Sequence, residues 1–178
     1  VRMILMPFEI VLQKMLAPKI KMIKVKAPLI ARAAKPGQFV IIRVDEVGER
    51  FPLTLIDWNE LDGTITLVFK EIGLSTIKLG RLKAGDLILD VVGPLGNPMH
   101  IVEGKKVCII AEDVKIASAY PRVKELRNRG NYVVAILIAD NSENIIMKRE
   151  LMQMCHEIYT ITCKKSKKKT DLVVDLLK

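Results

Sequence analysis

The sequence predicts an antiparallel β-barrel followed by a truncated α/β domain with a parallel sheet. Eight of the ten glycines lie at or before Gly96, so the first half is rich in turns. That half also carries short apolar runs of β type, separated by turn residues, at the spacing of a small barrel or sandwich. After Pro98 the pattern changes to apolar strands that alternate with helical segments, which is typical of a parallel sheet covered by helices.

The barrel half contains four strand patterns and one short helix. The turn Lys35-Pro36-Gly37 precedes the first strand, and the turn Leu61-Asp62-Gly63 separates the second strand from the third. The segment STIKLGRLKAGD supplies the helix, which begins near Ser75. The predicted strands are Phe39–Val44, Leu53–Trp58, Thr64–Lys70 and Leu87–Gly96.

The second half contains three strands and three helices. Gly130 is a helix stop signal, Ser142 is placed as an N-cap, and Asp171 lies near the start of the last helix. Three strands make a thin sheet, so this domain (residues 101–178) looks cut short beside the barrel domain (residues 1–100). The predicted strands are Val107–Ala111, Tyr132–Ala139 and Ile158–Thr162, and the helices are Ala117–Arg129, Ser142–Glu157 and Asp171–Lys178.

Composition excludes several classes of protein. Half of the 178 residues are apolar and 28% are charged, so the chain can bury a core and is not disordered. No apolar run approaches the roughly 20 residues that cross a bilayer. We therefore expect a soluble, cytoplasmic protein that does not bind a membrane. Much of the net charge of +9 lies in CKKSKKKTD, residues 163–171. No aromatic residues interleave with these lysines, so we expect a solvated loop and no nucleic acid partner.

The three cysteines, Cys108, Cys155 and Cys163, are odd in number and widely spaced, which indicates a reducing compartment without a disulfide framework. Cys155, His156 and Cys163 carry soft ligand atoms, but their spacing fits no common zinc pattern and a fourth ligand is missing. We therefore expect no metal site there.

Two segments of the barrel half carry residues suited to a phosphorylated ligand. In VFKEIGLSTIKLG, Gly73, Ser75 and Thr76 stand at the head of a helix, where backbone N–H groups and hydroxyls suit a pyrophosphate. In GERFPLTLIDW, Arg50 could pair bidentately with a phosphate, and Thr54 could hydrogen-bond the edge of a ring. Taken singly, each segment is weak evidence, because the first is more often an ordinary N-cap and the second more often a surface arginine.

Together with KPGQFVIIR and VVGPLG, these segments resemble, in order and spacing, the ferredoxin–NADP reductase superfamily. Within it, the chain resembles the small FAD subunits of sulfide dehydrogenase, or NADH-dependent ferredoxin–NADP oxidoreductase, and the electron-transfer subunits of dihydroorotate dehydrogenase. The likeness runs from about Leu16 to the C-terminus and is strongest from Lys35 to Gly96.

This resemblance implies a barrel of the FAD-binding type followed by an α/β nucleotide-binding-like domain for NAD(P). Pro52, Leu53 and Thr54 would then face the isoalloxazine ring. The remaining implied contacts are Val68, Phe69 and Lys70 for the ribityl chain and ring, and Gly73, Ser75 and Thr76 for the pyrophosphate. The chain departs from the superfamily pattern at two positions. Arg50 lies one place before the position of the superfamily's arginine, where this chain has Phe51. The usual flavin-stacking tyrosine is absent, and Leu53 lies near its place.

The NAD(P) loop departs further. Relatives carry a run of glycines after the first strand of this domain, where this chain has Ala111, Glu112, Asp113 and Lys115. These side chains fill space that a pyrophosphate needs, and the two carboxylates would repel it. Asp113 alternatively caps the following helix, which is compatible with a lost site. After the second strand of this domain the relatives carry an arginine suited to the NADP 2′-phosphate, whereas residues 139–141 of this chain contain no cation. After the third strand the relatives have an acidic loop that contains glycine, and this chain has the lysine-rich segment instead.

These observations predict a flavin-binding electron-transfer subunit whose own NAD(P) site is lost. Its partner would be a larger oxidoreductase subunit or an acidic electron-transfer protein such as a ferredoxin. The three cysteines cannot form a [2Fe–2S] cluster. Two alternatives stay open. One is a functional NAD(P)H-dependent FAD reductase component. The other is a non-catalytic scaffold built on a relic barrel.

Overall fold

A computed structural model describes residues 8–163 and 173–174 of the chain. These residues divide into two compact units with a boundary between Met99 and His100, apart from Leu16–Pro18, which groups with the second unit. Each unit is described by itself. The assignment of residues 1–100 and 101–178 to an FAD-binding and an NAD(P)-binding-like domain is a functional one and stays a proposal.

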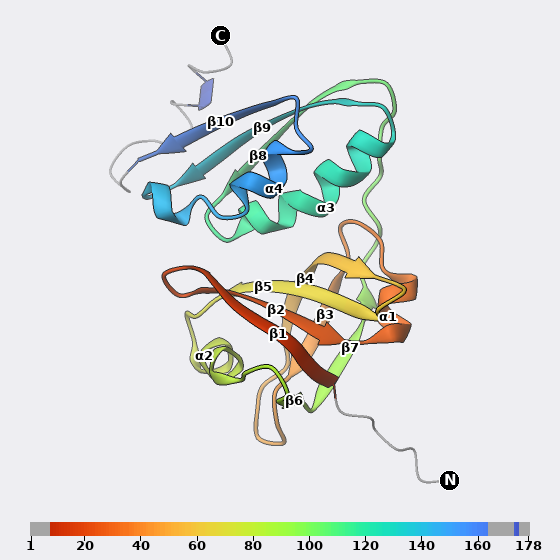
Figure 1. Cartoon of the computed structure of the whole chain (residues 1–178), viewed down its shortest axis with the longest axis vertical. Helices are drawn as coiled ribbons and strands as arrows, with labels where there is room; N and C mark the ends of the chain where they lie inside the picture. The colour runs from red at the N-terminus through yellow and green to blue at the C-terminus, as the bar shows by residue number, and fades with distance from the viewer. Residues whose placement is uncertain (1–7, 164–172, 175–178) are drawn as a thin grey trace. The chain divides into compact units, whose positions relative to one another are not determined.

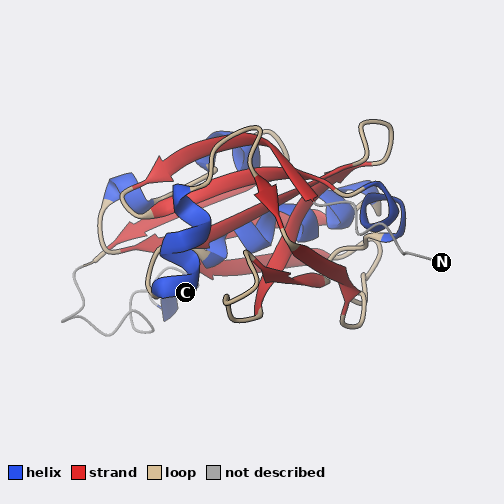
Figure 2. Ribbon diagram, turned by 90° about the horizontal axis from the view of Figure 1, so that it is seen from below, coloured by secondary structure: helices blue, strands red, loops and turns tan. Residues whose placement is uncertain are grey.

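The first unit is a barrel of seven strands in the order β6-β1-β2-β5-β4-β3-β7, with antiparallel pairing. The predicted antiparallel barrel is confirmed. Strands dominate this unit, and its two helices are short (Figures 1 and 2). The elements are β1 Phe8–Ala17, β2 Ile20–Lys26, α1 Pro28–Ala33, β3 Phe39–Arg43, β4 Phe51–Asn59, β5 Thr64–Lys70, α2 Leu74–Arg81, β6 Leu87–Ile88 and β7 Asp90–Leu95.

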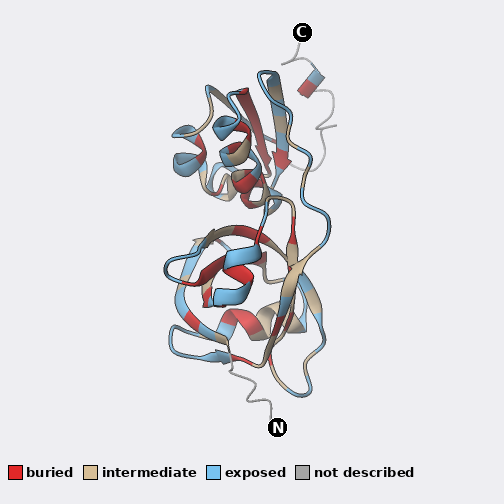
Figure 3. Ribbon diagram, turned by 90° about the vertical axis from the view of Figure 1, so that its right-hand side faces the viewer, coloured by how far each residue is buried: buried red, intermediate tan, exposed pale blue. Residues whose placement is uncertain are grey.

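The buried residues of this unit lie mainly along the strands of the barrel (Figure 3), and their side chains form one apolar cluster. Alternate residues of β5 point inward, so Ile65, Leu67 and Phe69 join one apolar cluster with Leu55 of β4. The hairpin of β1 and β2, which we did not predict, adds fully buried side chains such as Ile23 to the same cluster. Packing therefore determines which residues of β2, β4 and β5 face the barrel interior, and the alternate residues of each strand must face outward.

The second unit is a parallel sheet in the order β10-β9-β8, so the predicted parallel α/β arrangement is confirmed. Figure 1 shows α3 and α4 on the same side of this sheet. The segment between β9 and α4 forms one turn of 3-10 helix. The elements are β8 Lys106–Glu112, α3 Lys115–Asn128, β9 Tyr132–Ala139, a 3-10 turn Ser142–Asn144, α4 Lys148–Met152 and β10 Glu157–Thr162. No helix among the described residues combines the length and apolarity that a bilayer crossing demands.

The prediction of one helix over Ser142–Glu157 is wrong. The side chain of Asn141 accepts a hydrogen bond from the backbone N–H of Asn144 at 3.0 Å, so Asn141 rather than Ser142 caps the short 3-10 turn. Met147 then adopts a left-handed conformation with φ of 52°, which interrupts any continuous helix. The predicted last helix, Asp171–Lys178, lies mostly outside the described residues. Its two described residues, Val173 and Val174, are helical.

The Asn131 side chain links the segment before β8 to the end of α3 by hydrogen bonds. Its side chain, 1% exposed, accepts from the Lys105 N–H at 2.9 Å and donates to the carbonyls of Val102 at 2.7 Å and Leu126 at 2.8 Å. We expect Asn131→Ala to lower the free energy of unfolding by about 2 kcal/mol, because it leaves these buried groups without partners. Urea denaturation followed by circular dichroism measures this. Asn128→Ala, at an exposed position, is the control and should change stability by less than about 0.5 kcal/mol. Equal effects of the two variants would contradict the prediction.

Candidate functional site

The pairing of β4 with β5 stops part-way along both strands. The ladder runs from Asn59–Thr64 to Leu55–Leu67 and includes no pair beyond that point. Further on, β4 pairs with β3 from Thr54 onward, and β5 continues to pair with β2 up to Lys70. Backbone groups of the two strands that would have bonded each other are therefore available to a ligand. We call this place the β4–β5 opening, made by residues 52–54 and 68–70.

The side chains at the β4–β5 opening divide between two faces. Phe69 belongs to the barrel core and Leu53 packs against it. Because successive side chains of a strand alternate, Thr54 and Val68 lie on the outer face. A ligand on this face could meet the side chains of Pro52, Thr54 and Lys70, which are exposed or half-buried, whereas Val68 is buried. It would meet Leu53 and Phe69 through their backbone alone.

The first turn of α2 begins four residues after β5 ends. Thr76 builds the start of this helix: its Oγ1 accepts from the N–H groups of Ile72 at 3.0 Å and Gly73 at 3.1 Å and donates to the Gly73 carbonyl at 3.0 Å. The Thr76 hydroxyl therefore serves the helix cap, one of the two readings left open by the sequence. The N–H groups of Leu74, Ser75 and Thr76 have no acceptor among the described residues, as helix geometry requires.

The loop between β3 and β4 lies against α2. The Ser75 hydroxyl donates to the Glu49 carboxylate at 3.4 Å, and Lys78 forms an ion pair with Asp45. The hydrogen bond from Lys78 lowers the pKa of Asp45 below its ordinary value. These two contacts hold residue 50, which follows Glu49 directly, near the start of α2.

Arg50 itself is paired with a carboxylate. Its Nη2 lies 3.1 Å from Oδ2 of Asp90 on β7, and its side chain is 55% exposed. Binding a phosphate would require Arg50 to exchange or share this partner. Sequence reasoning missed both Glu49 and Asp90, because a pairing across 40 residues has no local signal.

The residues at α2 fit a diphosphate group. The first turn of α2 contains no acidic residue, its cap Gly73 has open space where a side chain would project, and three backbone N–H groups point to that end. The β4–β5 opening, with backbone donors and acceptors beside apolar Val68, suits the edge of a flat ring. The one contrary feature is the Glu49 carboxylate, which would repel an anion beside Ser75.

The turn between β8 and α3 keeps a backbone shape that favours glycine. Asp113 has φ of +49°, in the left-handed region that side chains rarely adopt. Its Oδ1 is buried and has no hydrogen-bond partner among the described residues. The N-cap of α3 is Val114, without a side-chain cap bond, so the prediction that Asp113 caps this helix is wrong. Only the Asp113 backbone carbonyl contributes, accepting from the Ile116 N–H at 3.0 Å.

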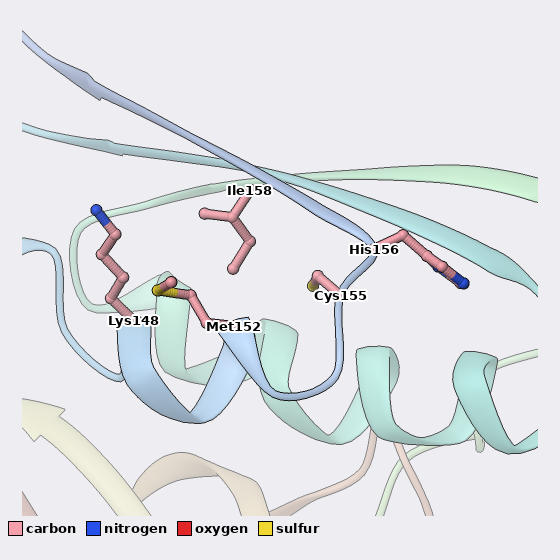
Figure 4. A pocket seen from close by; sticks show the side chains of 5 residues that line it. All are labelled: Lys148, Met152, Cys155, His156 and Ile158. Carbon is pink, nitrogen blue, oxygen red and sulfur yellow. The ribbon is translucent and has the colours of Figure 1, made fainter.

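A pocket of about 240 Å³ lies between α4 and the start of β10 in the second unit, and none of the predicted cofactor-binding residues lines it (Figure 4). It is lined by Lys148, Met152, Cys155, His156 and Ile158. Burial raises the pKa of the Cys155 thiol to about 11, so this thiol stays protonated at neutral pH. Figure 4 shows the His156 ring pointing away from Cys155. Among residues 8–163 and 173–174, no three His, Cys, Asp or Glu side chains gather around a possible metal ion.

No model of a protein family matches the chain. Curated relatives do: the chain is 41% identical over 130 residues to a Thermotoga maritima protein described as a dihydroorotate dehydrogenase B (NAD(+)) electron transfer subunit homolog, covering 73% of this chain and 46% of that protein. It is 36% identical over 162 residues to an uncharacterized Clostridium beijerinckii protein, covering 87% of this chain and 55% of that one. The chain thus spans about half the length of these relatives.

One solved structure decides the family. An NADH-dependent reduced ferredoxin–NADP oxidoreductase, studied for flavin-based electron bifurcation, superposes with a TM-score of 0.87 at 35% identity, over 96% of this chain and 63% of that one. The chain belongs to the ferredoxin–NADP reductase superfamily. The resemblance predicted from the sequence is therefore confirmed. A ferredoxin NADP+ reductase from Neisseria gonorrhoeae, at 19% identity and a TM-score of 0.74 over 94% of this chain and 75% of that one, shares the fold.

Proposed function

We propose that the chain is an FAD-binding electron-transfer module of a ferredoxin–NADP reductase-type oxidoreductase. One observation carries the proposal: the β4–β5 opening and the three free N–H groups of α2 are joined by a linker of three residues, Glu71 to Gly73. The first suits a flat ring and the second a diphosphate, which are the two ends of a flavin nucleotide. FAD would supply the redox chemistry, and the chain would bind it, orient it and tune its potential.

Each part of the site has a separate task in this proposal. The backbone of the β4–β5 opening would hydrogen-bond the polar edge of the isoalloxazine, with Thr54 and Lys70 beside it. Gly73 and the N–H groups of Leu74, Ser75 and Thr76 would hold the diphosphate. Arg50 would share its charge between Asp90 and the phosphate. Residues 1–100 would thus form the FAD-binding domain, and residues 101–178 a partial NAD(P)-binding-like domain.

The proposal includes the loss of the chain's own NAD(P) site. Its support is the β8–α3 turn, where Asp113 occupies a conformation suited to glycine and buries a carboxylate oxygen without a partner. A pyrophosphate at this helix start would meet that negative charge. The lysine-rich segment 163–171, which also departs from the relatives, lies almost wholly outside the described residues.

Electrons would then come from, or pass to, a partner. The Thermotoga maritima relative and one from Desulforamulus reducens, 32% identical over 152 residues, are described as electron transfer subunits of dihydroorotate dehydrogenase B. By analogy, we propose a larger oxidoreductase subunit or an acidic electron-transfer protein as the partner. A cytoplasmic location stays a prediction.

Titration of the purified chain with FAD tests the function. We expect saturable binding of one FAD per chain with quenched flavin fluorescence, reduction of the bound flavin by dithionite, and no bleaching by NADH or NADPH. Rapid bleaching by NADPH would favour the alternative of a complete reductase component. Failure to bind FAD would overturn the proposal and favour a scaffold on a relic barrel.

Asp113→Gly tests the strained turn directly. We expect a gain of about 1 kcal/mol in the free energy of unfolding, because glycine adopts a positive φ without strain and no longer buries a lone carboxylate. Urea denaturation followed by circular dichroism measures the change. Val114→Gly is the matched control: Val114 has φ of −58°, so glycine there should cost about 1 kcal/mol instead. A loss of stability in Asp113→Gly would contradict the interpretation.

A further inference from the structure

The barrel carries an ion pair on the inward-facing side of its strands. Lys21 of β2 and Glu71, directly after β5, continue the alternation of Ile23 and Phe69, which belong to the apolar core cluster. Lys21 Nζ lies 3.0 Å from Glu71 Oε1, and the two side chains are only 17% and 18% exposed. A lysine and a glutamate withdrawn this far from water are stable only as a pair. Each therefore depends on the other to stay in this place.

The last turn of α2 lies against this ion pair. Lys21 Nζ donates to the Gly80 carbonyl at 2.5 Å, and Gln13 Nε2 of β1 donates to the same oxygen at 2.9 Å. Carbonyls of a last helical turn have no partner within the helix, and a cation beside them interacts favourably with the helix dipole. Leu79, next to Gly80, belongs to the apolar core cluster. Lys21 therefore binds Glu71 and the packed end of α2 at the same time.

The Glu71 carboxylate requires glycine at position 80. A Cβ on Gly80 would lie 1.9 Å from Glu71 Oε1 and 2.8 Å from its Cδ, so no larger residue fits while the carboxylate stays where it is. Gly80 lies inside a helix, where glycine is less stable than alanine. The close contact with Glu71 explains why a glycine occupies this helical position.

Glu71 connects the two parts of the proposed site. Its backbone N–H donates to the Lys19 carbonyl at 2.7 Å, which extends the pairing of β5 with β2 beyond Lys70. Its side chain reaches Lys21 and the last turn of α2. Two residues later, Gly73 caps the start of the same helix. Glu71 is thus fixed both to the strand that forms one side of the β4–β5 opening and to the helix whose N–H groups we assign to the diphosphate.

We infer that Lys21, Glu71 and Gly80 form a brace that positions the start of α2 relative to the β4–β5 opening, and that they are positioning residues for the diphosphate of FAD. This inference rests on the proposed function. Helix α2 has eight residues and is therefore roughly 12 Å long, so a tilt at its last turn moves the N–H groups of its first turn. Hydrogen bonds from those groups need donor–acceptor distances of about 2.7–3.2 Å, so a displacement of about 1 Å weakens them.

Gly80→Ala tests the brace without removing a charge. The added methyl group displaces the Glu71 carboxylate, so the dissociation constant for FAD in the full 178-residue chain should rise about tenfold, although alanine is the better helix former. Flavin fluorescence quenching measures this constant. Glu71→Ala should also weaken binding, but it leaves room for the methyl group. The double variant should therefore bind FAD no more weakly than Glu71→Ala alone. Losses that add in the double variant would contradict the inference.

Substitutions of Lys21 test the charged part of the brace. Lys21→Met should raise the dissociation constant for FAD about tenfold, whereas Lys21→Arg keeps the charge and should raise it less than about threefold. Lys24→Met is the matched control, because it removes the same charge from the other face of the same strand, and it should change binding less than about twofold. Equal losses from Lys21→Met and Lys24→Met would assign the effect to net charge and overturn the brace.

The folded fraction of each variant separates positioning from stability. Trp58 fluorescence in urea gives this fraction under the titration conditions, and the apparent dissociation constant is the true one divided by it. A variant that stays more than about nine-tenths folded can therefore change the apparent constant by only about a tenth through unfolding. FAD binding that neither Gly80→Ala nor Lys21→Met weakens, after this correction, would overturn the brace and leave the proposed function standing. An unaltered chain that binds no FAD would overturn both.

Discussion

Leu67→Ala is expected to lower the free energy of unfolding of the barrel unit by about 3 kcal/mol. Leu67 is fully buried in β5 and lies between Ile23 of β2 and Leu55 of β4, its partners in the two neighbouring ladders. All three side chains point into one cluster, so no exposed group can collapse into the space that the leucine leaves. The variant therefore loses both the transfer free energy of the side chain and the contacts around a cavity.

Trp58 offers a clean measurement of this effect. It is the only tryptophan, and it packs against the barrel core, so its fluorescence in urea reports the unfolding of the first unit. Leu67→Met keeps the volume and should cost less than about 1.5 kcal/mol. If alanine and methionine were equally mild, Leu67 would not be part of a close-packed barrel core.

The sequence predicted those strands whose apolar runs are bounded by turn residues. β5 and β9 begin and end where the sequence indicated, because Gly63 and Asn131 mark their starts and their interiors are continuously apolar. The first hairpin was missed although Ile23 and Val25 are buried at the spacing of a strand. The lysines between and around these residues dilute the pattern, and the inner face becomes visible only once β5 supplies the pairing partner.

Local backbone conformations account for the wrong predictions in the second unit. The residues after β9 favour a helix by composition, but Met147 adopts a left-handed conformation that propensity does not predict. Asp113 looks like a helix cap because acids are common there. In the structure its carboxylate makes no hydrogen bond to the helix N–H groups, and it lies in a turn whose shape suits glycine. Both cases depend on single φ values that tertiary packing imposes.

The parts of the candidate site that lie on continuous segments of the sequence could be predicted, and the parts that depend on contacts between distant segments could not. The start of α2 and the ends of β4 and β5 are continuous segments, so their residue types indicated a phosphate and a ring. Glu49 and Asp90 become part of the site through contacts over 26 and 40 residues, which depend on the closed barrel. These two carboxylates decide how much positive charge the site offers, and only the structure reveals them.

Ser75→Glu is expected to weaken FAD binding about 100-fold, if the diphosphate binds at the start of α2. Ser75 is the second residue of the helix, between two N–H groups that we assign to the phosphates. A carboxylate there would stand within a few ångströms of the diphosphate. Like charges at about 4 Å repel by a few kcal/mol at an interface between protein and water. Fluorescence titration with FAD measures the dissociation constant.

The same substitution should not harm the fold, which separates this explanation from misfolding. An acidic residue in the first turn interacts favourably with the helix dipole, and this offsets its repulsion from Glu49, so the free energy of unfolding should change by less than about 0.5 kcal/mol while FAD affinity falls. Ser75→Gln has a similar shape without the charge and should weaken binding less than tenfold. If glutamate and glutamine were equally damaging, sterics rather than charge would be responsible, and the diphosphate would not need this helix start.

The neighbouring carboxylate gives the opposite expectation at the same place. Glu49 lies 3.4 Å from the Ser75 hydroxyl, so it already contributes part of the repulsion that Ser75→Glu would add. Glu49→Gln should therefore tighten FAD binding several-fold, and the gain should shrink as salt screens the charges. Ser75 and Glu49 are in contact in the structure. If adding a negative charge at one weakens FAD binding and removing a negative charge at the other tightens it, the anionic group of FAD must bind beside both. A diphosphate bound elsewhere would leave the affinity insensitive to both.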